Sequence, residues 1–497
     1  MFTLFGMLVL SVIGLAMVGR TANAVRLGHL QRDSAAAFNL AESGAERGLL
    51  WLHQQGSPPQ NTSSFGVYSE NLGAGSYGVT IVPDADNASN PTKLPRYLIV
   101  STGTAGMRTE TVQLYVQLKS FGSWAYFNNI EDPSLWYIAG MQMNGPVHSN
   151  NANGALMNVD WVNSTTPIFM DTTSVVAGSM NYYPTAPVGD SQYRDIYAQG
   201  IAGLELNTFS IPLPATSDKQ KNAAWGSSVG FPTTSGVYVP ASGSTANGGL
   251  YLKGDSTIQF ATDNGHPAWQ VINITNGGKS YTVTIKRDTN QTVVKPQSGS
   301  STTYSGTTNG VIYVDGNVTS LSGTLADNVV SGSSVSQRNA FTLATNVTAG
   351  DDVTLTDNLV YKTQPDKSKA WNDSSNLKAA TMGIVTQNFH LDGGVAPSEL
   401  TVNAIIMAGG LNTQGTEDTL NWWSAPAGNY YCLGGLIEYT AGVTGMFDPS
   451  SNTMLAGYLE HYTYDYRMLT NPPPYFPTTN GYQKLSWQRT QAGASGS

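Results

Sequence analysis

Acidic side chains are the residues of this sequence most suited to chemistry, and the candidates lie in its second half. They are Asp315, Asp351, Asp352 and Asp357. Enzymes that act on polysaccharides use carboxylates on neighbouring strands as acid/base pairs or as calcium ligands. Asp351 and Asp352, however, follow a glycine and precede an apolar run, which is typical of a turn. No spacing among the four specifies a metal or an acid/base pair.

Histidines and the common catalytic motifs add no further site. The six histidines, at positions 29, 53, 148, 266, 390 and 461, form no pair separated by three or four residues. The sequence contains no GxSxG, Walker or HExxH motif. His148 follows a Gly-Pro turn in GPVHSN, which favours a hydrogen-bonded structural role. We therefore predict no catalytic residue, no metal and no cofactor, and a protein that is not an enzyme.

Aromatic side chains are the candidates for ligand binding. Trp422, Trp423 and Tyr430 have side chains that can stack on sugar rings, although packing in a core or interface is the interpretation that we favour. The single cysteine, Cys432, excludes an intrachain disulfide and is expected to be a small buried residue. Asp465 and Arg467 are expected to form a structural ion pair.

The composition indicates an extracellular β protein of two to four domains. The chain has 497 residues, a net charge of −9 and only 11% charged residues, against about 25% in typical domains. Glycine is plentiful, and Ser, Thr and Asn crowd the body of the chain. The negative charge and the lack of a basic run exclude nucleic acid as an expected partner.

One long helix over residues 1–56 is the element that must position everything else. Phe2–Val18 is an uncharged apolar run of 17 residues, at the short end of the roughly 17–25 that span a bilayer. An apolar or small stripe with steps of mostly three and four follows it, at Leu27, Leu30, Ser34, Ala37, Phe38, Ala41, Ala45, Leu49 and Leu52. Gly-Ser-Pro-Pro ends the pattern, and the helix would be about 80 Å long.

We predict that this helix inserts into a membrane and packs against other helices. Small residues inside an apolar helix allow such close approach. The residues assigned to this role are Phe2, Leu4, Gly6, Leu8, Leu10, Gly14, Leu15, Phe38, Ala41, Glu42 and Gly44.

Two other interpretations of the first residues stay open. A cleavable secretory signal would use Ala22-Asn23-Ala24 as its cleavage site, although no Lys or Arg precedes the apolar run. A simple one-pass anchor would, by the positive-inside rule, leave the body in the cytoplasm, because Arg20 and Arg26 follow the run. Long domains, however, translocate largely regardless of charge.

The body divides into four predicted regions. Residues 60–120 alternate as strands and predict a small antiparallel sheet on the helix, with TETVQLYVQL as its clearest strand. Residues 121–234 form an aromatic, Gly/Pro-rich connecting region. Residues 235–446 are short strands with polar turns, which favour a right-handed parallel β-helix, with a β-sandwich as the runner-up; residues 261–305 are expected to protrude from it as a hairpin. Residues 447–497 are a Tyr/Pro-rich strap expected across its end.

The N-terminal 55 residues resemble type IV pilus-assembly minor-pilin-like proteins, with a PilX-type segment. Their A-x-x-A-E-x-G-x-x-R pattern corresponds to the stretch AFNLAESGAERGLLWL, around Ala41, Glu42 and Gly44. Two features depart from the family: no basic leader precedes Phe2, and Phe5 and Gly6 stand where pilins usually carry a glutamate. The β-rich stretches GPVHSN, GVIYVDGNV, AIIMAGG and the YDYR…PPYFP tail resemble large pilin-like surface proteins that bear a β-helix.

The resemblance implies a structural, non-catalytic envelope protein: a minor pilin-like component that presents a β-helix for assembly or adhesion. Its expected partners are the membrane, other pilin-like subunits and, as a candidate ligand, surface polysaccharide. It would be anchored in the inner membrane before assembly and then lie at the cell surface or in an extracellular pilus. The alternative is a membrane-tethered β-helix that binds or processes carbohydrate.

Overall fold

The chain forms two compact units. The structure is a computed structural model that describes residues 2–55, 58–89, 93–162, 164, 166–371, 373–409, 415–420, 428–448 and 453–491. Unit 1 comprises residues 1–119 and 480–497, and unit 2 comprises residues 120–479. The chain leaves unit 1 once and returns to it, so unit 2 is an insertion in unit 1.

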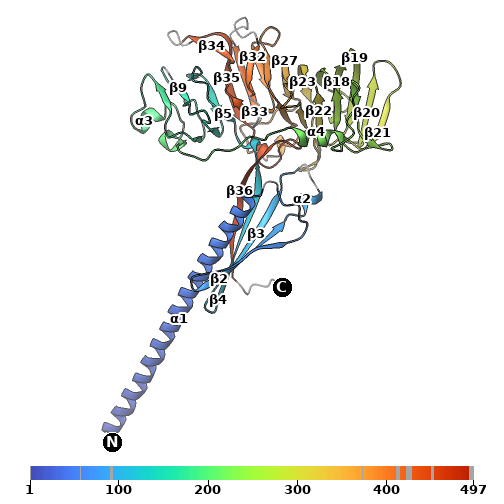
Figure 1. Ribbon diagram of the computed structural model, residues 1–497. Helices are drawn as coiled ribbons and strands as arrows, with labels where there is room; N and C mark the ends of the chain where they lie inside the picture. The colour runs from blue at the N-terminus through green and yellow to red at the C-terminus, as the bar shows by residue number, and fades with distance from the viewer. Residues whose placement is uncertain are drawn as a thin grey trace. The chain divides into compact units, whose positions relative to one another are not determined.

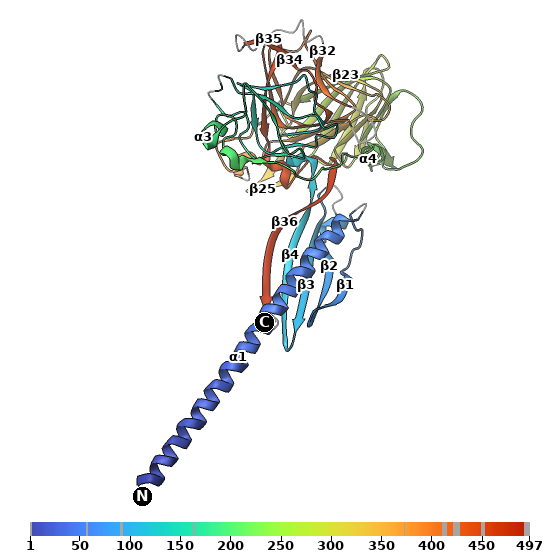
Figure 2. The same cartoon turned by 60° about the vertical axis from the view of Figure 1, so that its left-hand side comes forward.

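Unit 1 is a long helix packed on one five-stranded sheet (Figure 1). Its strand order is β1-β2-β3-β4-β36, and the first four strands pair antiparallel. The elements are α1 (Phe2–His53), β1 (Phe65–Leu72), β2 (Gly75–Pro83), α2 (Asp86–Ser89), β3 (Arg96–Ala105), β4 (Arg108–Ser120) and β36 (Thr478–Gln491). Figure 2 shows β36 beside β4, with the sheet lying along only the C-terminal part of α1.

Small residues let α1 lie directly on the sheet. Its buried positions are Ala37, Leu40, Ala41, Gly44, Ala45, Gly48, Leu49 and Leu52. A Cβ atom on Gly44 would lie only 2.3 Å from the Ser101 hydroxyl, and one on Gly48 would lie 2.8 Å from Ile99. The predicted stripe is therefore confirmed from Ala37 onward. Leu27, in contrast, is exposed.

The strand faces of unit 1 follow the predicted alternation. The side chains that alternate toward the helix are buried: Tyr77, Val79, Ile81, Tyr97, Ile99, Ser101, Val112, Leu114, Val116 and Leu118. Glu42 and Glu46 would repel each other across one turn of α1. Lys484 of β36 supplies the missing cation, with its Nζ 2.5 Å from the Glu46 carboxylate.

Unit 2 contains two ladders of mainly parallel strands. The first ladder is parallel throughout, and its order along the stack does not follow the sequence. It runs through β12 (Leu204–Glu205), β10 (Thr173–Val175), β8 (Val147–Ser149), β5 (Tyr126–Ile130), β33 (Gly428–Thr440), β31 (Ile405–Ala408), β28 (Thr381–Thr386), β26 (Ala340–Ala344), β22 (Val311–Asp315) and β16 (Leu250–Lys253).

The second ladder branches once. From β17 (Ser256–Thr262), β23 (Val318–Leu325) and β27 (Val353–Tyr361), one branch holds β29 (Phe389–Asp392) and β32 (Glu417–Leu420). The other holds β30 (Glu399–Val402), β33, β35 (Thr453–Tyr464) and β7 (Gln142–Asn144). Strand β33 belongs to both ladders and changes from one to the other at Gly434, whose φ is +147°. A Cβ there would lie 2.1 Å from the Ala404 carbonyl oxygen, so only glycine fits this corner.

Shorter elements surround the ladders. An antiparallel meander extends β17 at the predicted insertion, through β18 (Trp269–Asn276), β19 (Lys279–Lys286), β20 (Gln291–Pro296) and β21 (Thr302–Ser305). The remaining strands are β6 (Tyr137–Ile138), β9 (Asn158–Asp160), β11 (Asn181–Tyr183), β13 (Gly236–Tyr238), β14 (Ala241–Ser242), β15 (Thr245–Ala246), β24 (Val329–Ser331), β25 (Ser334–Gln337) and β34 (Gly445–Asp448). The short helices are α3 (Gly189–Tyr193), α4 (Asp218–Trp225), η1 (Phe121–Ser123), η2 (Gly200–Gly203), η3 (Ser374–Asn376) and η5 (Tyr466–Leu469).

The chain is thus mainly β, with a long N-terminal helix, an antiparallel sheet on that helix and mixed sheets beyond it. Two segments lie elsewhere than expected. Residues 121–234 are not only a connection, because β5, β8 and β10 continue the first ladder. Residues 447–497 do not form one strap, because β35 joins the second ladder and β36 joins the sheet of unit 1. The strap was inferred from the Tyr- and Pro-rich composition, but the position of this segment is set by backbone hydrogen bonds between strands.

Candidate functional site

The N-terminal part of α1 is an apolar surface without partners inside the chain. Phe2, Leu4, Leu8, Leu10 and Leu15 are all exposed, Phe2 by 95%. A Cβ added to Gly6 or Gly14 would meet no described atom within 4 Å. The most apolar 18-residue window of α1 has a mean hydropathy of 2.3 and is wholly unburied. Among the described residues, α1 is the one helix long and apolar enough to cross a membrane.

The other predicted helix residues pack within the chain. Ala41 and Gly44 are buried against the sheet of unit 1, and Phe38 and Glu42 are half-buried. The Phe38 ring meets the Trp487 ring edge to face at 6.1 Å. Ala41 and Gly44 therefore serve the core of this chain, whereas the first apolar residues stay free.

The predicted sugar-stacking residues do not form a surface in the described chain. Trp422 and Trp423 lie outside the described residues. Tyr430 packs in the core, as the favoured interpretation has it, and is not available to stack on a sugar: its side chain is 0% exposed and its hydroxyl donates to Glu417 at 2.9 Å. Tyr430 faces inward from β33. The next residue, Tyr431, faces outward and stacks on His461 at 4.9 Å.

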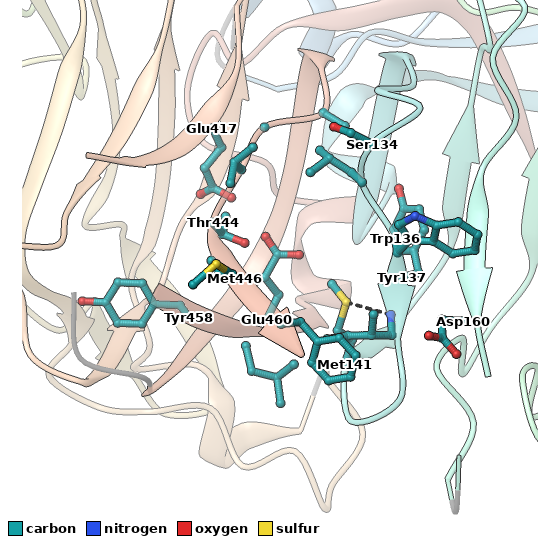
Figure 3. Close-up of a pocket in the computed structure, with 18 of the residues that line it drawn as sticks. Ser134, Trp136, Tyr137, Met141, Asp160, Glu417, Thr444, Met446, Tyr458 and Glu460 are labelled. Atoms are coloured by element: carbon teal, nitrogen blue, oxygen red, sulfur yellow. Dashed lines mark hydrogen bonds between the residues drawn. The ribbon is translucent and has the colours of Figure 1, made fainter. Parts of the chain in front are cut away.

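Unit 2 holds a cavity of about 550 Å³ that sequence analysis did not predict. Figure 3 shows Glu417, Thr444 and Glu460 on one side of it and Trp136, Tyr137 and Asp160 on the other. The first side comes from β32, β35 and the segment before β34, and the second from β6, the residue before it and β9. A volume of this size lies within the roughly 300–1,000 Å³ of small-molecule sites.

Three buried glutamates line this cavity and are held by tyrosine hydroxyls. Glu417 accepts from Tyr430 at 2.9 Å and from Tyr462 at 2.7 Å. Glu438 accepts from Tyr126 at 2.6 Å and from the backbone N–H of Glu417 at 3.1 Å. The Tyr462 hydroxyl also lies 3.4 Å from Glu460. The described partners of these oxygens are thus tyrosine hydroxyls and a backbone N–H, and none of them is a Lys, Arg or His side chain.

Burial without a cation raises the pKa of each carboxyl group. Desolvation is the main cause, and the neighbouring acidic groups add to it for Glu417 and Glu438. The pKa of Glu417 is raised to about 8, and the pKa of Glu460 is raised to about 7. The pKa of Glu438 is raised well above its ordinary value. Glu131, which also lines the cavity, has its pKa raised by burial to about 7.

The acidic residues named from the sequence do not gather at this cavity. Asp315 accepts from Lys253 Nζ at 2.8 Å and from the Tyr251 hydroxyl at 2.9 Å. Asp352 accepts from Asn388 Nδ2 at 2.8 Å. Asp357 accepts from the N–H of Asn358. Among the described residues, no three His, Cys, Asp or Glu side chains are arranged to hold a metal ion.

Three structural assignments made from the sequence are confirmed. His148 is buried, with its ring nitrogens 2.8 Å from Ser174 Oγ and 3.0 Å from Asn150 Oδ1. Asp465 and Arg467 form a buried ion pair at 2.5 Å. Cys432 is a buried residue, and burial raises the pKa of its thiol.

The sequence does contain a signal for the cavity glutamates. Glu438 lies within an otherwise apolar strand, GGLIEYT, and Glu460 follows Tyr-Leu in a strand rich in tyrosine. An isolated acid among apolar strand residues is costly unless it is partnered. That pattern marks each residue singly. Their convergence depends on the ladder order, which the sequence does not reveal.

Comparisons with known proteins add little to this geometry. No protein-family model matches the chain, and no curated protein matches it. Among solved structures, it is similar to the competence-associated pilin ComZ from Thermus thermophilus, at 13% sequence identity and a TM-score of 0.31. The likeness covers 92% of this chain and 98% of that chain. At this TM-score it establishes neither a common fold nor a common function.

Proposed function

We propose that this chain is a structural, non-catalytic component of a type IV pilus or pseudopilus, similar to a minor pilin with a PilX-type N-terminal segment. One observation carries the proposal. A single 52-residue helix is wholly exposed and apolar in its first part and buried on an antiparallel sheet in its later part. The free apolar part needs a bilayer or other helices to cover it. The same helix therefore links a globular unit to a membrane or a helical filament core.

The location follows from the same helix. Before assembly, the apolar part of α1 would be embedded in the inner membrane. After assembly, it would pack against the helices of other pilin-like subunits, and the chain would lie at the cell surface or in an extracellular pilus. The exposed Gly6 and Gly14 allow close contact between helices in that filament.

Unit 2 would present the outer surface. We propose that its two ladders are faces of a right-handed parallel β-helix, in which β33 turns a corner at Gly434. The parallel pairing supports this, since a β-sandwich is built of antiparallel sheets. The right hand is the one that parallel strand connections almost always adopt. Such a unit would serve assembly or adhesion, with surface polysaccharide as a candidate partner.

The proposal of a non-catalytic role has its own support at the cavity. Hydrolysis of a sugar bond needs two carboxyl groups whose pKa values are pushed apart, so that one is an acid and the other is ionised. In the cavity the pKa values of Glu417, Glu438 and Glu460 are all raised. Among these three glutamates, the shared direction of the pKa shift separates no acid from a base.

The test is a charge placed in the free part of α1. Leu8→Lys puts a cation into the apolar surface, and Gln31→Lys is the matched control because Gln31 is exposed outside it. We expect wild-type protein and Gln31→Lys in the membrane fraction and in sheared filaments. Leu8→Lys should be depleted from the sheared filaments by at least about tenfold. If Leu8→Lys enters filaments normally, the proposal fails.

The N-terminus of the protein recovered from cells separates the remaining interpretations. A protein that starts at Phe2 with a modified amine supports prepilin-type processing and assembly. A protein that starts at Val25 is a secreted protein without its helix, which contradicts the proposal. The membrane-tethered carbohydrate-binding alternative is supported instead if deletion of the apolar run leaves pili intact and releases a soluble protein that binds polysaccharide.

A further inference from the structure

The cavity in unit 2 is acidic, and its described wall contains no basic side chain. Five of its described lining residues are acidic: Glu131, Asp160, Glu417, Glu438 and Glu460. The described lining residues include no Lys, Arg or His. Each carboxyl group that ionises there faces other acids across a confined space, which costs free energy unless a cation enters. The described wall therefore lacks a positive charge that could balance ionised carboxyl groups.

A second feature, independent of the acids, also indicates a missing ligand. The side chain of Tyr137 is more than nine-tenths buried and lines the cavity. No hydrogen bond of ordinary length and angle joins its hydroxyl to a described residue, although the Tyr126 hydroxyl is near enough to lower its pKa against the effect of burial. A buried hydroxyl without a partner is unfavourable, and such groups are rare in folded proteins. A ligand in the cavity could accept this hydrogen bond.

The wall opposite the glutamates is aromatic. Trp136 and Tyr137 lie there (Figure 3), and Trp136 is 38% exposed. Aromatic faces attract cations, and clusters of them recognise quaternary ammonium groups. The described residues provide no metal-binding group. Carboxylates and aromatic faces together favour an organic cation over a metal ion.

We propose that the cavity binds a small organic cation, whose ammonium group lies among Glu417, Glu438 and Glu460 and whose body packs on Trp136 and Tyr137. The proposal goes beyond the structural role of the chain and does not depend on it. It differs from binding of a neutral sugar, which would use the same carboxyl groups in their protonated form as hydrogen-bond donors.

The protonation of the cavity distinguishes these ligands. As the pH rises past about 7–8, Glu460 and Glu417 lose their protons. A cation should then bind more tightly and a neutral sugar less tightly. The groups that face the ligand from all surrounding elements are Glu131, Asp160, Glu417, Glu438 and Glu460, with the hydroxyls of Tyr126, Tyr137, Tyr458 and Tyr462 nearby. The pKa of each of these tyrosines is raised, so they stay protonated in this range.

The experiment is calorimetric titration of the full chain in detergent with three probes. Benzyltrimethylammonium is permanently charged, so any change of its affinity with pH comes from the protein. Benzyl alcohol is its neutral counterpart, and cellobiose represents a neutral sugar. We expect the cation to bind at least about tenfold more tightly than benzyl alcohol, and its affinity to rise about tenfold between about pH 6 and 8.5.

Matched variants locate the binding. Glu460→Gln keeps the shape and one acceptor but removes the charge, and it should weaken cation binding about tenfold. Trp136→Ala, at an exposed side chain that folding should tolerate, should weaken it about fivefold. Glu399→Gln is the control, because Glu399 lies on β30 outside the cavity and bonds Asn429. Its affinity should equal that of the wild type.

Three results would overturn the proposal. The first is no binding of the cation by folded wild-type protein at millimolar concentration. The second is binding of cellobiose or benzyl alcohol at least as tight as that of the cation. The third is cation binding that neither Glu460→Gln nor Trp136→Ala changes. Near-ultraviolet circular dichroism of each variant confirms folding, so a loss of binding cannot be a loss of structure.

Discussion

Unit 2 buries carboxyl groups in two contrasting ways. Asp465 is fully buried and forms an ion pair with Arg467, whose Nη2 and Nε lie 2.5 Å and 2.9 Å from its two oxygens. Arg467 also donates to the Ala379 carbonyl at 2.7 Å and lies over the Tyr361 ring. Among the described residues, the cavity glutamates bond hydroxyl and N–H groups.

The difference shows that one fold can hold two kinds of buried carboxyl group: one that is neutralised within the chain and one that a ligand could neutralise. A buried acid with its own cation two residues away has its charge balanced within the chain. A buried acid whose partners are hydroxyl donors is stable in its neutral form. If it ionises, a cation from outside the chain must balance the charge. The charge of the cavity acids is therefore expected to change with pH and with a bound ligand.

Breaking the complete pair should have the largest effect. Arg467→Met leaves Asp465 buried without its cation, and we expect a loss of about 3–5 kcal/mol in the free energy of unfolding of unit 2. Chemical denaturation measures it. The double variant Asp465→Asn/Arg467→Met removes both charges and should recover part of the loss. A double variant as unstable as the single one would mean that the pair is not the cause.

Removing a hydroxyl from the cavity should have an intermediate effect. Tyr462→Phe takes away the donor 2.7 Å from Glu417, and we expect a loss of about 1–3 kcal/mol in the free energy of unfolding. Tyr431→Phe is the control, because the Tyr431 side chain is exposed on the outer face of β33. Its stability should stay within about 0.5 kcal/mol of the wild type. Equal losses for both variants would contradict the special role of the cavity hydroxyls.

The pH dependence of stability should sharpen the contrast further. The pKa values of Glu417 and Glu460 in the folded chain are raised to about 8 and about 7. Stability from such groups is fully present below their unfolded pKa of about 4.5 and is lost as the pH rises through the folded values. We expect the Tm of unit 2 to fall between about pH 5 and 8.5, and Glu417→Gln to reduce this slope. A slope that Glu417→Gln leaves unchanged would exclude Glu417 as its source.

His390 offers the smallest effect and the opposite arrangement, a cation between two acids. Its Nδ1 lies 2.5 Å from Asp418 and its Nε2 lies 3.4 Å from Asp352. These carboxylates raise the pKa of His390 to about 9, against the effect of burial. Its stabilisation is fully present below pH about 6.5 and lost as the pH rises through about 9. NMR titration should show this pKa, and Asp418→Asn should lower it; an ordinary pKa of about 6.5 would contradict the arrangement.

The sequence predicts unit 1 well because its helix and strands follow periodic patterns of apolar residues over short stretches of the chain. The three- and four-residue steps from Ala37 to Leu52 and the alternation in TETVQLYVQL each place side chains on one face. The short strands of residues 235–446 are also predicted, and apolar strand residues such as Leu321 and Leu355 are buried. Periodicity reports which way a side chain faces, whatever its partner.

The rest of the structure depends on pairing between distant strands. The strand β5 pairs with β33, and no periodic signal links two segments so far apart. Strands of two or three residues, such as β8 and β12, are too short to show alternation. The cavity is hidden for the same reason. The convergence of Glu417, Glu438 and Glu460 can be seen only once the order of the strands in the ladders is known.

The return of the chain to unit 1 has a consequence for how the protein is made. Strands β1 to β4 are synthesised first, yet their sheet lacks β36 until all of unit 2 has followed. Folding during synthesis generally completes N-terminal units first. Here the sheet of unit 1 cannot be completed until β36 has been synthesised, and until then β4 is an open sheet edge. Removal of β36 should therefore leave unit 2 intact while exposing that edge to aggregation.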